Sequence, residues 1–156
     1  MKAKVVGLIS DTHGLLRPAA LGALHGVDHL IHAGDVGNPD LLQPLSAIAP
    51  LTVVRGNVDR GPWAEALPET AEVELGGRWI HVRHILDELD LDPSAAGFDV
   101  VVYGHSHKPD IEHRRGVLYV NPGSAGPRRF QLPVTVALLH LTAGAPRAEL
   151  VSLAIG

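Results

Sequence analysis

The sequence predicts an α/β fold in which two mixed β-sheets pack together, with helices on their outer faces. Three observations lead to this prediction. Between residues 4 and 60, apolar runs alternate with helix-like segments, the pattern of parallel strands joined by helical crossovers. After Gly61-Pro62 the apolar runs follow one another with short turns between them, as antiparallel strands do. The hydrophobic residues make up 46% of the chain, which is enough material for a core.

The first part of the chain reads as strand, helix, strand, helix, strand. The predicted segments are strands 4–9, 27–33 and 51–54 and helices 15–25 and 39–48. Leucines recur at helical spacing in both helices, with Gly26 and Pro50 at their ends. This alternation predicts three parallel strands joined by right-handed crossovers, so their carboxyl ends should lie along one edge.

The remainder of the chain is predicted to be rich in antiparallel strands. The predicted strands are 69–75, 78–84, 98–103, 111–113, 117–120, 134–141 and 148–153. Gly76-Gly77 and Arg114-Arg115-Gly116 are typical hairpin turns, and one or two short helices broken by Pro93 are expected within 85–97. The last two strands are expected to complete this antiparallel half.

Length and composition exclude several classes of protein. The 156 residues are expected to form a single domain, 1–156, that buries roughly 70% of its unfolded surface. A net charge of −4 predicts no broad basic face for nucleic acid or anionic membranes. Without cysteine, disulfides and thiolate metal sites are excluded. No apolar run approaches the ~18 residues of a membrane span, and we expect a cytoplasmic protein.

Residues with metal-binding side chains follow the ends of the predicted strands. They are Asp11 and His13, Asp35, Asn57, His84 or His81, and His105 with His107. Ligand sites collect at the carboxyl ends of strands in α/β proteins. A lone His-X-His turn would indicate only two solvated imidazoles, and turn-capping carboxylates and amides would be the ordinary interpretation of the others. Repetition at the ends of strands 4–9, 27–33, 51–54 and 98–103 favours a shared site instead.

The mixed donor set indicates which metals such a site would take. Oxygen donors and imidazole nitrogens in nearly equal number suit Mn²⁺, Fe²⁺, Co²⁺, Ni²⁺ or Zn²⁺ better than Ca²⁺ or Mg²⁺. The donors are too many for one ion, and a single-metal structural site would leave several unused. Two ions sharing Asp35 would use the set. Ions about 3.5–4 Å apart can clamp a phosphoryl oxygen and lower the pKa of a water between them.

The motifs resemble, in their order, those of the calcineurin-like metallophosphoesterases. They are Asp11-Thr-His13, Gly34-Asp35, Gly56-Asn57, a histidine after a sheet strand, and Gly104-His105-Ser-His107. The resemblance covers essentially the whole chain and is closest to the small bacterial and archaeal phosphodiesterases of the YfcE type. Asn121-Pro-Gly-Ser124 and the following Pro127-Arg128 also resemble that branch. The resemblance implies a four-layer α/β/β/α sandwich and a hydrolase with a two-metal phosphoesterase site.

Carried over residue by residue, the resemblance implies two metal-binding sets. One ion would take Asp11, His13 and His107, and the other Asn57, His84 and His105, with Asp35 between them. His84 is preferred to His81 because the family's histidine closes its strand, although Ile85 replaces the usual glycine. Asp35, Asn57 and His105 would also serve catalysis. From their chemistry alone, Arg128 and Arg129 could hold a substrate phosphate or could equally be surface charge, and Arg128 is the candidate contact. Mn²⁺ is the expected ion, with Ni²⁺, Co²⁺, Fe²⁺ or Zn²⁺ as alternatives.

The reaction implied is hydrolysis of a phosphodiester by a hydroxide that bridges the two ions. Without an inserted cap domain, the site should be open to small phosphate esters, and a phosphomonoesterase is the alternative within the same class. A homodimer is compatible with this branch. The alternative from another class is a protein-interaction scaffold, because a retromer subunit of this fold carries an apolar residue where this chain has Val58.

Val58 departs from the family pattern. Many members have a histidine directly after the Gly-Asn pair, where it contacts the phosphoryl group and protonates the leaving group. Valine has no group that donates a proton or binds an oxyanion. We therefore expect modest turnover and a preference for leaving groups of low pKa. Asp59, the next residue, is expected to accept a hydrogen bond from a metal-binding histidine.

Overall fold

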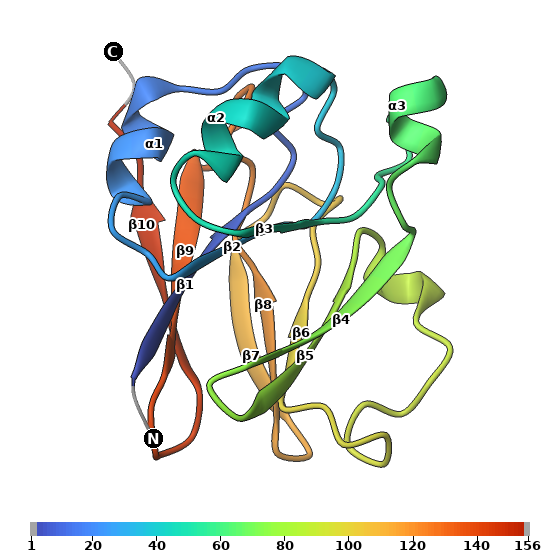
Figure 1. Ribbon diagram of the computed structural model, residues 1–156, viewed down its shortest axis with the longest axis vertical. Coiled ribbons are helices and arrows are strands. Elements are labelled where there is room, and N and C mark those ends of the chain that lie inside the picture. The colour runs from blue at the N-terminus through green and yellow to red at the C-terminus, as the bar shows by residue number, and fades with distance from the viewer. Residues whose placement is uncertain (1–2, 155–156) are drawn as a thin grey trace.

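A computed structural model describes residues 3–154, which form two five-stranded sheets. The first sheet has, in spatial order, β10 (Arg147–Ser152), β9 (Thr135–Leu141), β1 (Lys4–Ile9), β2 (His29–His32) and β3 (Leu51–Val53). The second has β4 (Thr70–Leu75), β5 (Arg78–Arg83), β6 (Val100–Val102), β8 (Val117–Asn121) and β7 (Asp110–Arg114). Figure 1 shows the first sheet toward the left and the second toward the right.

The first sheet confirms the predicted parallel strands and corrects the placement of the last two. β1, β2 and β3 pair in parallel, with Leu8 opposite Ile31 and Ile31 opposite Thr52. β9 and β10 form the expected antiparallel pair, but β9 also pairs with β1, so both strands extend the first sheet. The alternation of apolar residues predicts that such a hairpin forms, but it does not identify the sheet that receives it.

The second sheet is mixed. β5, β6 and β8 run parallel at its centre, and the antiparallel strands β4 and β7 form its edges. The two predicted hairpins are both present, joining β4 to β5 and β7 to β8. Because β1, β2, β3, β5 and β6 all lie in parallel pairs within their sheets, the loops that follow them are well placed to form one site.

The helices are short. The helical segments of residues 3–154 are α1 (Pro18–Ala23), η1 (Pro39–Leu41), α2 (Leu42–Ser46), α3 (Pro62–Glu65) and η2 (Leu86–Glu88). α1 occupies only the centre of the predicted helix 15–25, because Arg17 is extended before proline, with φ −74° and ψ 140°, and Gly26 has a φ of 84°. α3 was not predicted, since its four residues are too few to show helical periodicity.

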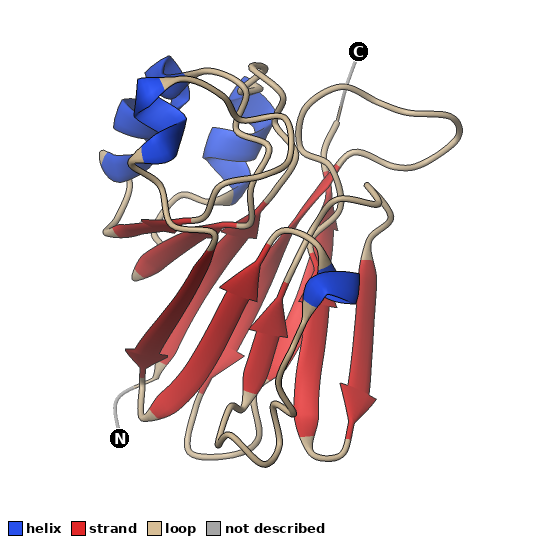
Figure 2. Ribbon diagram, turned by 90° about the vertical axis from the view of Figure 1, so that its right-hand side faces the viewer, coloured by secondary structure: helices blue, strands red, loops and turns tan. Residues whose placement is uncertain are grey.

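Three apolar layers hold the sheets and helices together and confirm the four-layer sandwich. The largest lies between the sheets and includes Leu8, Ile31 and Val102, all fully buried. A second joins the first sheet to α1 and α2. A third covers the outer face of the second sheet, where η2 is the single helical turn (Figure 2). No helix in the described part of the chain is long and apolar enough to cross a bilayer.

Candidate metal centre

The loops at the strand ends place the predicted donor residues together. Asp11 and His13 follow β1, Asp35 follows β2, Asn57 follows β3, His84 follows β5, and His105 and His107 follow β6. In two groups, each of three residues, the potential ligand atoms lie within 4.8 Å of one another. The centre therefore combines residues from both sheets.

The first group contains Asp11, His13 and His107. The Nε2 atoms of the two histidines are 3.2 Å apart. Both also face the Asp11 carboxylate, whose Oδ1 is 3.7 Å from Nε2 of His13 and 3.5 Å from Nε2 of His107. Two imidazole nitrogens and a carboxylate oxygen thus point at one small region, which is the arrangement that a transition-metal ion requires.

The second group contains Asp35, His84 and His105. Asn57 joins it through its amide Oδ1, which lies 3.1 Å from Nδ1 of His105. Nδ1 of His84 is 2.8 Å from the carbonyl oxygen of Ala33, to which it must donate its hydrogen. The lone pair of the neutral ring is then on Nε2, the nitrogen that faces the carboxylates.

Asp35 lies between the two groups. Its Oδ2 is 3.4 Å from Nε2 of His13 and 3.0 Å from Nε2 of His84. The other oxygen, Oδ1, accepts a hydrogen bond of 3.0 Å from the N–H of Val58. One oxygen therefore faces both histidine sets while the backbone holds the other, which fits a bridging carboxylate.

The hydrogen bonds of the Asp11 carboxylate indicate whether a cation fits beside it. Its Oδ2 accepts hydrogen bonds from the Ser10 hydroxyl at 2.8 Å and from the N–H of His105 at 3.1 Å. Its Oδ1 is buried and has no hydrogen-bond partner among residues 3–154. An unsatisfied buried carboxylate oxygen is costly unless a cation or water meets it. The donor set therefore fits a metal ion on this side of Asp11.

Backbone strain is concentrated in these loops. Asp11, His13, Asp35, His105 and His107 all have positive φ, between 45° and 74°. Such angles cost of order 1 kcal/mol or more for a non-glycine residue, and they cluster at functional sites. The loops also approach each other closely: a Cβ on Gly56 would clash with Asp35, and one on Gly104 would clash with Ser10. Five of the seven predicted donor residues therefore have a strained backbone conformation.

Asp59 has a different role from the one expected. Its carboxylate accepts hydrogen bonds from the N–H groups of Val36, Gly37 and Gly56, at 3.2, 2.9 and 2.9 Å. The expected bond to a metal-binding histidine is therefore replaced by a clamp between the loops after β2 and β3. Asp59 carries this role because its neighbours in space are loops, which leave N–H groups without sheet partners.

His32 supports the site without facing it. Its Nδ1 accepts from the N–H of Gly34 at 3.1 Å, so the neutral ring donates from Nε2 to the Thr12 hydroxyl at 3.0 Å. Thr12 in turn donates to the carbonyl oxygen of Val36. Complete burial of the ring lowers the pKa of His32 to about 4. A neutral histidine therefore links the loops after β1 and β2.

The acidic surroundings change the protonation of two central groups. Burial alone would lower the pKa of His84, but its contact with Asp35 and the charges of Asp11 and Asp35 outweigh burial and raise it. Burial would raise the pKa of Asp35, but His84, the N–H of Val58 and the charge of His13 lower it. The two residues thus favour the ion pair when no metal competes.

The structure separates the two histidines that the sequence offered after β4. His84 lies in the centre, whereas His81 is buried elsewhere, with its ring centroid 5.2 Å from that of Phe98.

Val58 is 41% exposed beside Asn57. The Arg128 side chain is exposed and makes no hydrogen bond or ion pair within residues 3–154. Burial lowers the pKa of His107 and the charge of Asp11 opposes this, while the charge of Arg129 lowers it further.

Comparisons with known proteins identify relatives of this chain. Residues 5–144 match the family profile of the calcineurin-like phosphoesterase superfamily domain. A probable metallophosphoesterase of Methanothermobacter thermautotrophicus is 31% identical over 145 residues, covering 86% of this chain and 84% of that protein. The phosphodiesterase YfcE of Escherichia coli K12 is 29% identical over 160 residues, covering 83% and 84%.

A solved structure shows the same fold. Vacuolar Protein Sorting 29 from Cryptosporidium parvum superposes with a TM-score of 0.76, covering 98% of this chain and 99% of that one. Its sequence is 20% identical, so this likeness concerns the fold alone. Proteins of this architecture therefore include both phosphoesterases and a vacuolar protein sorting component.

Proposed function

Because the chain belongs to the calcineurin-like phosphoesterase superfamily, we propose that it is a phosphodiesterase that works with two divalent metal ions. The observation that carries the proposal is the position of Asp35, whose Oδ2 faces a histidine of each donor group at 3.4 and 3.0 Å. A single shared carboxylate between two histidine sets supports two adjacent ions.

The residues would divide between the ions. Asp11, His13 and His107 would hold one, and His84, His105 and Asn57 would hold the other, with Asp35 shared. Mn²⁺ suits this mixture of oxygen and nitrogen donors, as do Ni²⁺, Co²⁺, Fe²⁺ and Zn²⁺. When bound, two such ions lower the pKa of a water that they share and stabilise negative charge on phosphoryl oxygens.

The chain's own residues would orient the substrate. Asn57 and His105 are the exposed members of the donor set, with the Asn57 amide oxygen 3.1 Å from the His105 ring. Their exposed positions allow them to contact a phosphoryl group as it reaches the centre, and the Asn57 amide can donate a hydrogen bond to it. Val58 offers no proton to a leaving group, so activated phosphodiesters and small phosphate esters are the expected substrates.

An assembly scaffold without turnover is the second candidate, and the likeness to Vacuolar Protein Sorting 29 supports it. The exposed Val58 beside the centre is compatible with that role as well. The complete donor set supports the enzyme, with Oδ1 of the buried Asp11 within 3.7 Å of three imidazoles.

The test is hydrolysis of bis(p-nitrophenyl) phosphate and p-nitrophenyl phosphate by metal-stripped protein, with Mn²⁺, Ni²⁺, Co²⁺, Zn²⁺ or Mg²⁺ added back. We expect diester cleavage that requires metal and is lost in Asp35→Ala but retained in the matched control Asp40→Ala, an exposed position. Preference for the monoester would indicate a phosphomonoesterase. Two bound metals without turnover of either ester would favour the scaffold.

A further inference from the structure

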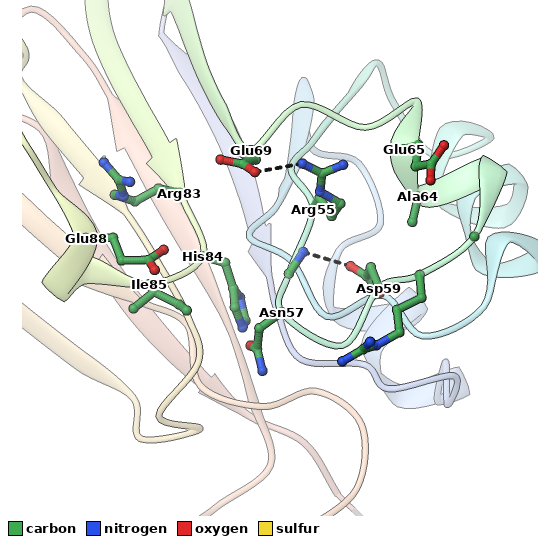
Figure 3. A pocket seen from close by; sticks show the side chains of 13 residues that line it. Arg55, Asn57, Asp59, Ala64, Glu65, Glu69, Arg83, His84, Ile85 and Glu88 are labelled. Atoms are coloured by element: carbon green, nitrogen blue, oxygen red, sulfur yellow. Dashed lines mark hydrogen bonds and ion pairs between the residues drawn. The ribbon is translucent and has the colours of Figure 1, made fainter.

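A groove of about 660 Å³ opens beside the metal centre, and Asn57 and His84 form part of its wall. Arg83 and Arg55 also line it, as does Glu88 of η2; Figure 3 shows how these side chains lie around His84 and Asn57. Small-molecule sites in proteins commonly have volumes of about 300–1,000 Å³. A substrate held at the metal centre therefore has room to extend into this groove.

Arg83 is the notable residue of the groove, because its side chain is largely buried and its guanidinium is poorly paired. The side chain is 12% exposed, and its Nε is buried without a hydrogen-bond partner in the part of the chain that the structure describes. Its one ion pair there is with Asp90, at 3.9 Å, and the Asp90 side chain is 89% exposed. A guanidinium has five donors suited to phosphate and carboxylate oxygens. Arg83 thus has guanidinium donors that no protein group uses in the described part of the chain, and an anion could accept hydrogen bonds from them.

Some of the other charged residues of the groove already have partners within the protein. Arg55 is paired with Glu69 at 2.8 Å, and Asp59 accepts three backbone N–H groups. The charged lining residues whose side chains have neither an ion pair nor a hydrogen bond between residues 3 and 154 are Arg60, Glu65 and Glu88. Figure 3 shows Glu88 below Arg83, on the same side of the groove. Arg83 therefore supplies the available buried positive charge, and Glu88 limits how much negative charge the groove accepts.

We propose that the groove binds a second anionic group of the substrate, with Arg83 as its principal contact. The inference rests on the proposed phosphodiesterase function and specifies the substrate class: a phosphodiester that carries one additional phosphate, as a nucleotide diester with a terminal phosphate does. The diester lies at the metal centre, and the second phosphate lies beside the guanidinium. Several donors and a low exposure make this contact stronger than a surface ion pair.

The experiment compares two substrates that differ by one phosphate: thymidine 5′-(4-nitrophenyl phosphate), with and without a 3′-phosphate. Both release 4-nitrophenolate, so leaving-group chemistry is constant. The additional phosphate should raise kcat/KM about tenfold, the size of one charge-assisted hydrogen bond. Arg83→Gln should bring this ratio close to one, and Glu88→Gln should increase it. The matched control Arg114→Gln should leave it unchanged, because Arg114 lies in β7 and pairs with Glu112.

A ratio near one in the unaltered protein, or a ratio that Arg83→Gln does not reduce, would overturn the inference. Arg83→Lys should keep part of the preference, so it and Glu88→Gln decide the matter if Arg83→Gln folds poorly. Hydrolysis of bis(p-nitrophenyl) phosphate, measured in parallel, separates the two proposals. Cleavage of this diester without a preference for the extra phosphate refutes only the groove, whereas no cleavage of any ester refutes the proposed function as well.

Discussion

Nε2 of His84 lies 3.0 Å from Oδ2 of Asp35, although His84 follows a strand of the second sheet and Asp35 a strand of the first. The candidate metal centre therefore lies where the two sheets meet. Any cation held by both residues would also fasten the sheets to each other. Metal binding and folding stability should be coupled for this reason.

We first predict that Mn²⁺ raises the melting temperature of the metal-stripped protein. At a hundred times the dissociation constant, a ligand specific for the folded state adds about 2.7 kcal/mol to the free energy of unfolding. Because the pKa of His84 is raised and coordination requires a neutral ring, the effect should shrink as the pH falls. Differential scanning calorimetry at several pH values, with and without EDTA, measures this. An equal shift in Asp35→Ala would argue against binding at the centre.

A second prediction concerns Val58. Val58→His should raise kcat for diesters with poor leaving groups, such as alkyl or unsubstituted phenyl esters, by about a hundredfold, the lower range of general acid catalysis. Nitrophenyl esters should change little, since their leaving groups need no proton. Val58→Gln, which is polar but donates no proton at neutral pH, is the control. Equal effects of histidine and glutamine, or a loss with both, would contradict the role assigned to this position.

Asp59 provides a test of the loop clamp. Asp59→Ala removes the acceptor from three backbone N–H groups and should lower the free energy of unfolding by about 3 kcal/mol. The exposed Asp40→Ala should change it by less than about 0.5 kcal/mol. Urea unfolding of the two variants gives both values. A loss in Asp59→Ala no larger than in the control would mean that water replaces the carboxylate at no cost.

His32 should make the metal-free protein less stable in acid. Its pKa is about 4 in the folded protein, below the ordinary histidine value of 6.5 that applies to the unfolded chain. Its contribution is therefore fully present above pH 6.5 and is lost as the pH falls toward 4, up to about 3 kcal/mol. His32→Gln should flatten this part of the stability profile, whereas the exposed His113→Gln should not. Parallel profiles for His32→Gln and the unaltered protein would show that the ring does not titrate in this way.

The parallel strands and hairpins were predictable because their signals are local. Leu8, Ile31 and Val102 lie in apolar runs typical of buried strands, and Gly76-Gly77 and Gly116 mark the two hairpin turns. The sheet that receives β9 was not predictable, because that choice depends on packing between segments far apart in sequence. The late start of α1 also has a local cause, because Pro18 disfavours a helical conformation at Arg17.

The composition of the candidate site was predictable, but its supporting contacts were not. Asp11, Asp35 and the histidines belong to short motifs whose residue types carry the chemistry. The clamp by Asp59 and the neutral link through His32 depend on which loops meet in space. The burial of Arg83 likewise has no local signature, since a lone arginine at a strand end is ordinarily solvated.

The most direct test of the two-metal centre is a crystal structure of the protein soaked in Mn²⁺, with anomalous scattering recorded. The account predicts two anomalous peaks about 3.5–4 Å apart, one on each side of the Asp35 carboxylate. Asp11, His13 and His107 should contact one peak, and Asn57, His84 and His105 the other. A single peak, or peaks away from Asp35, would contradict it.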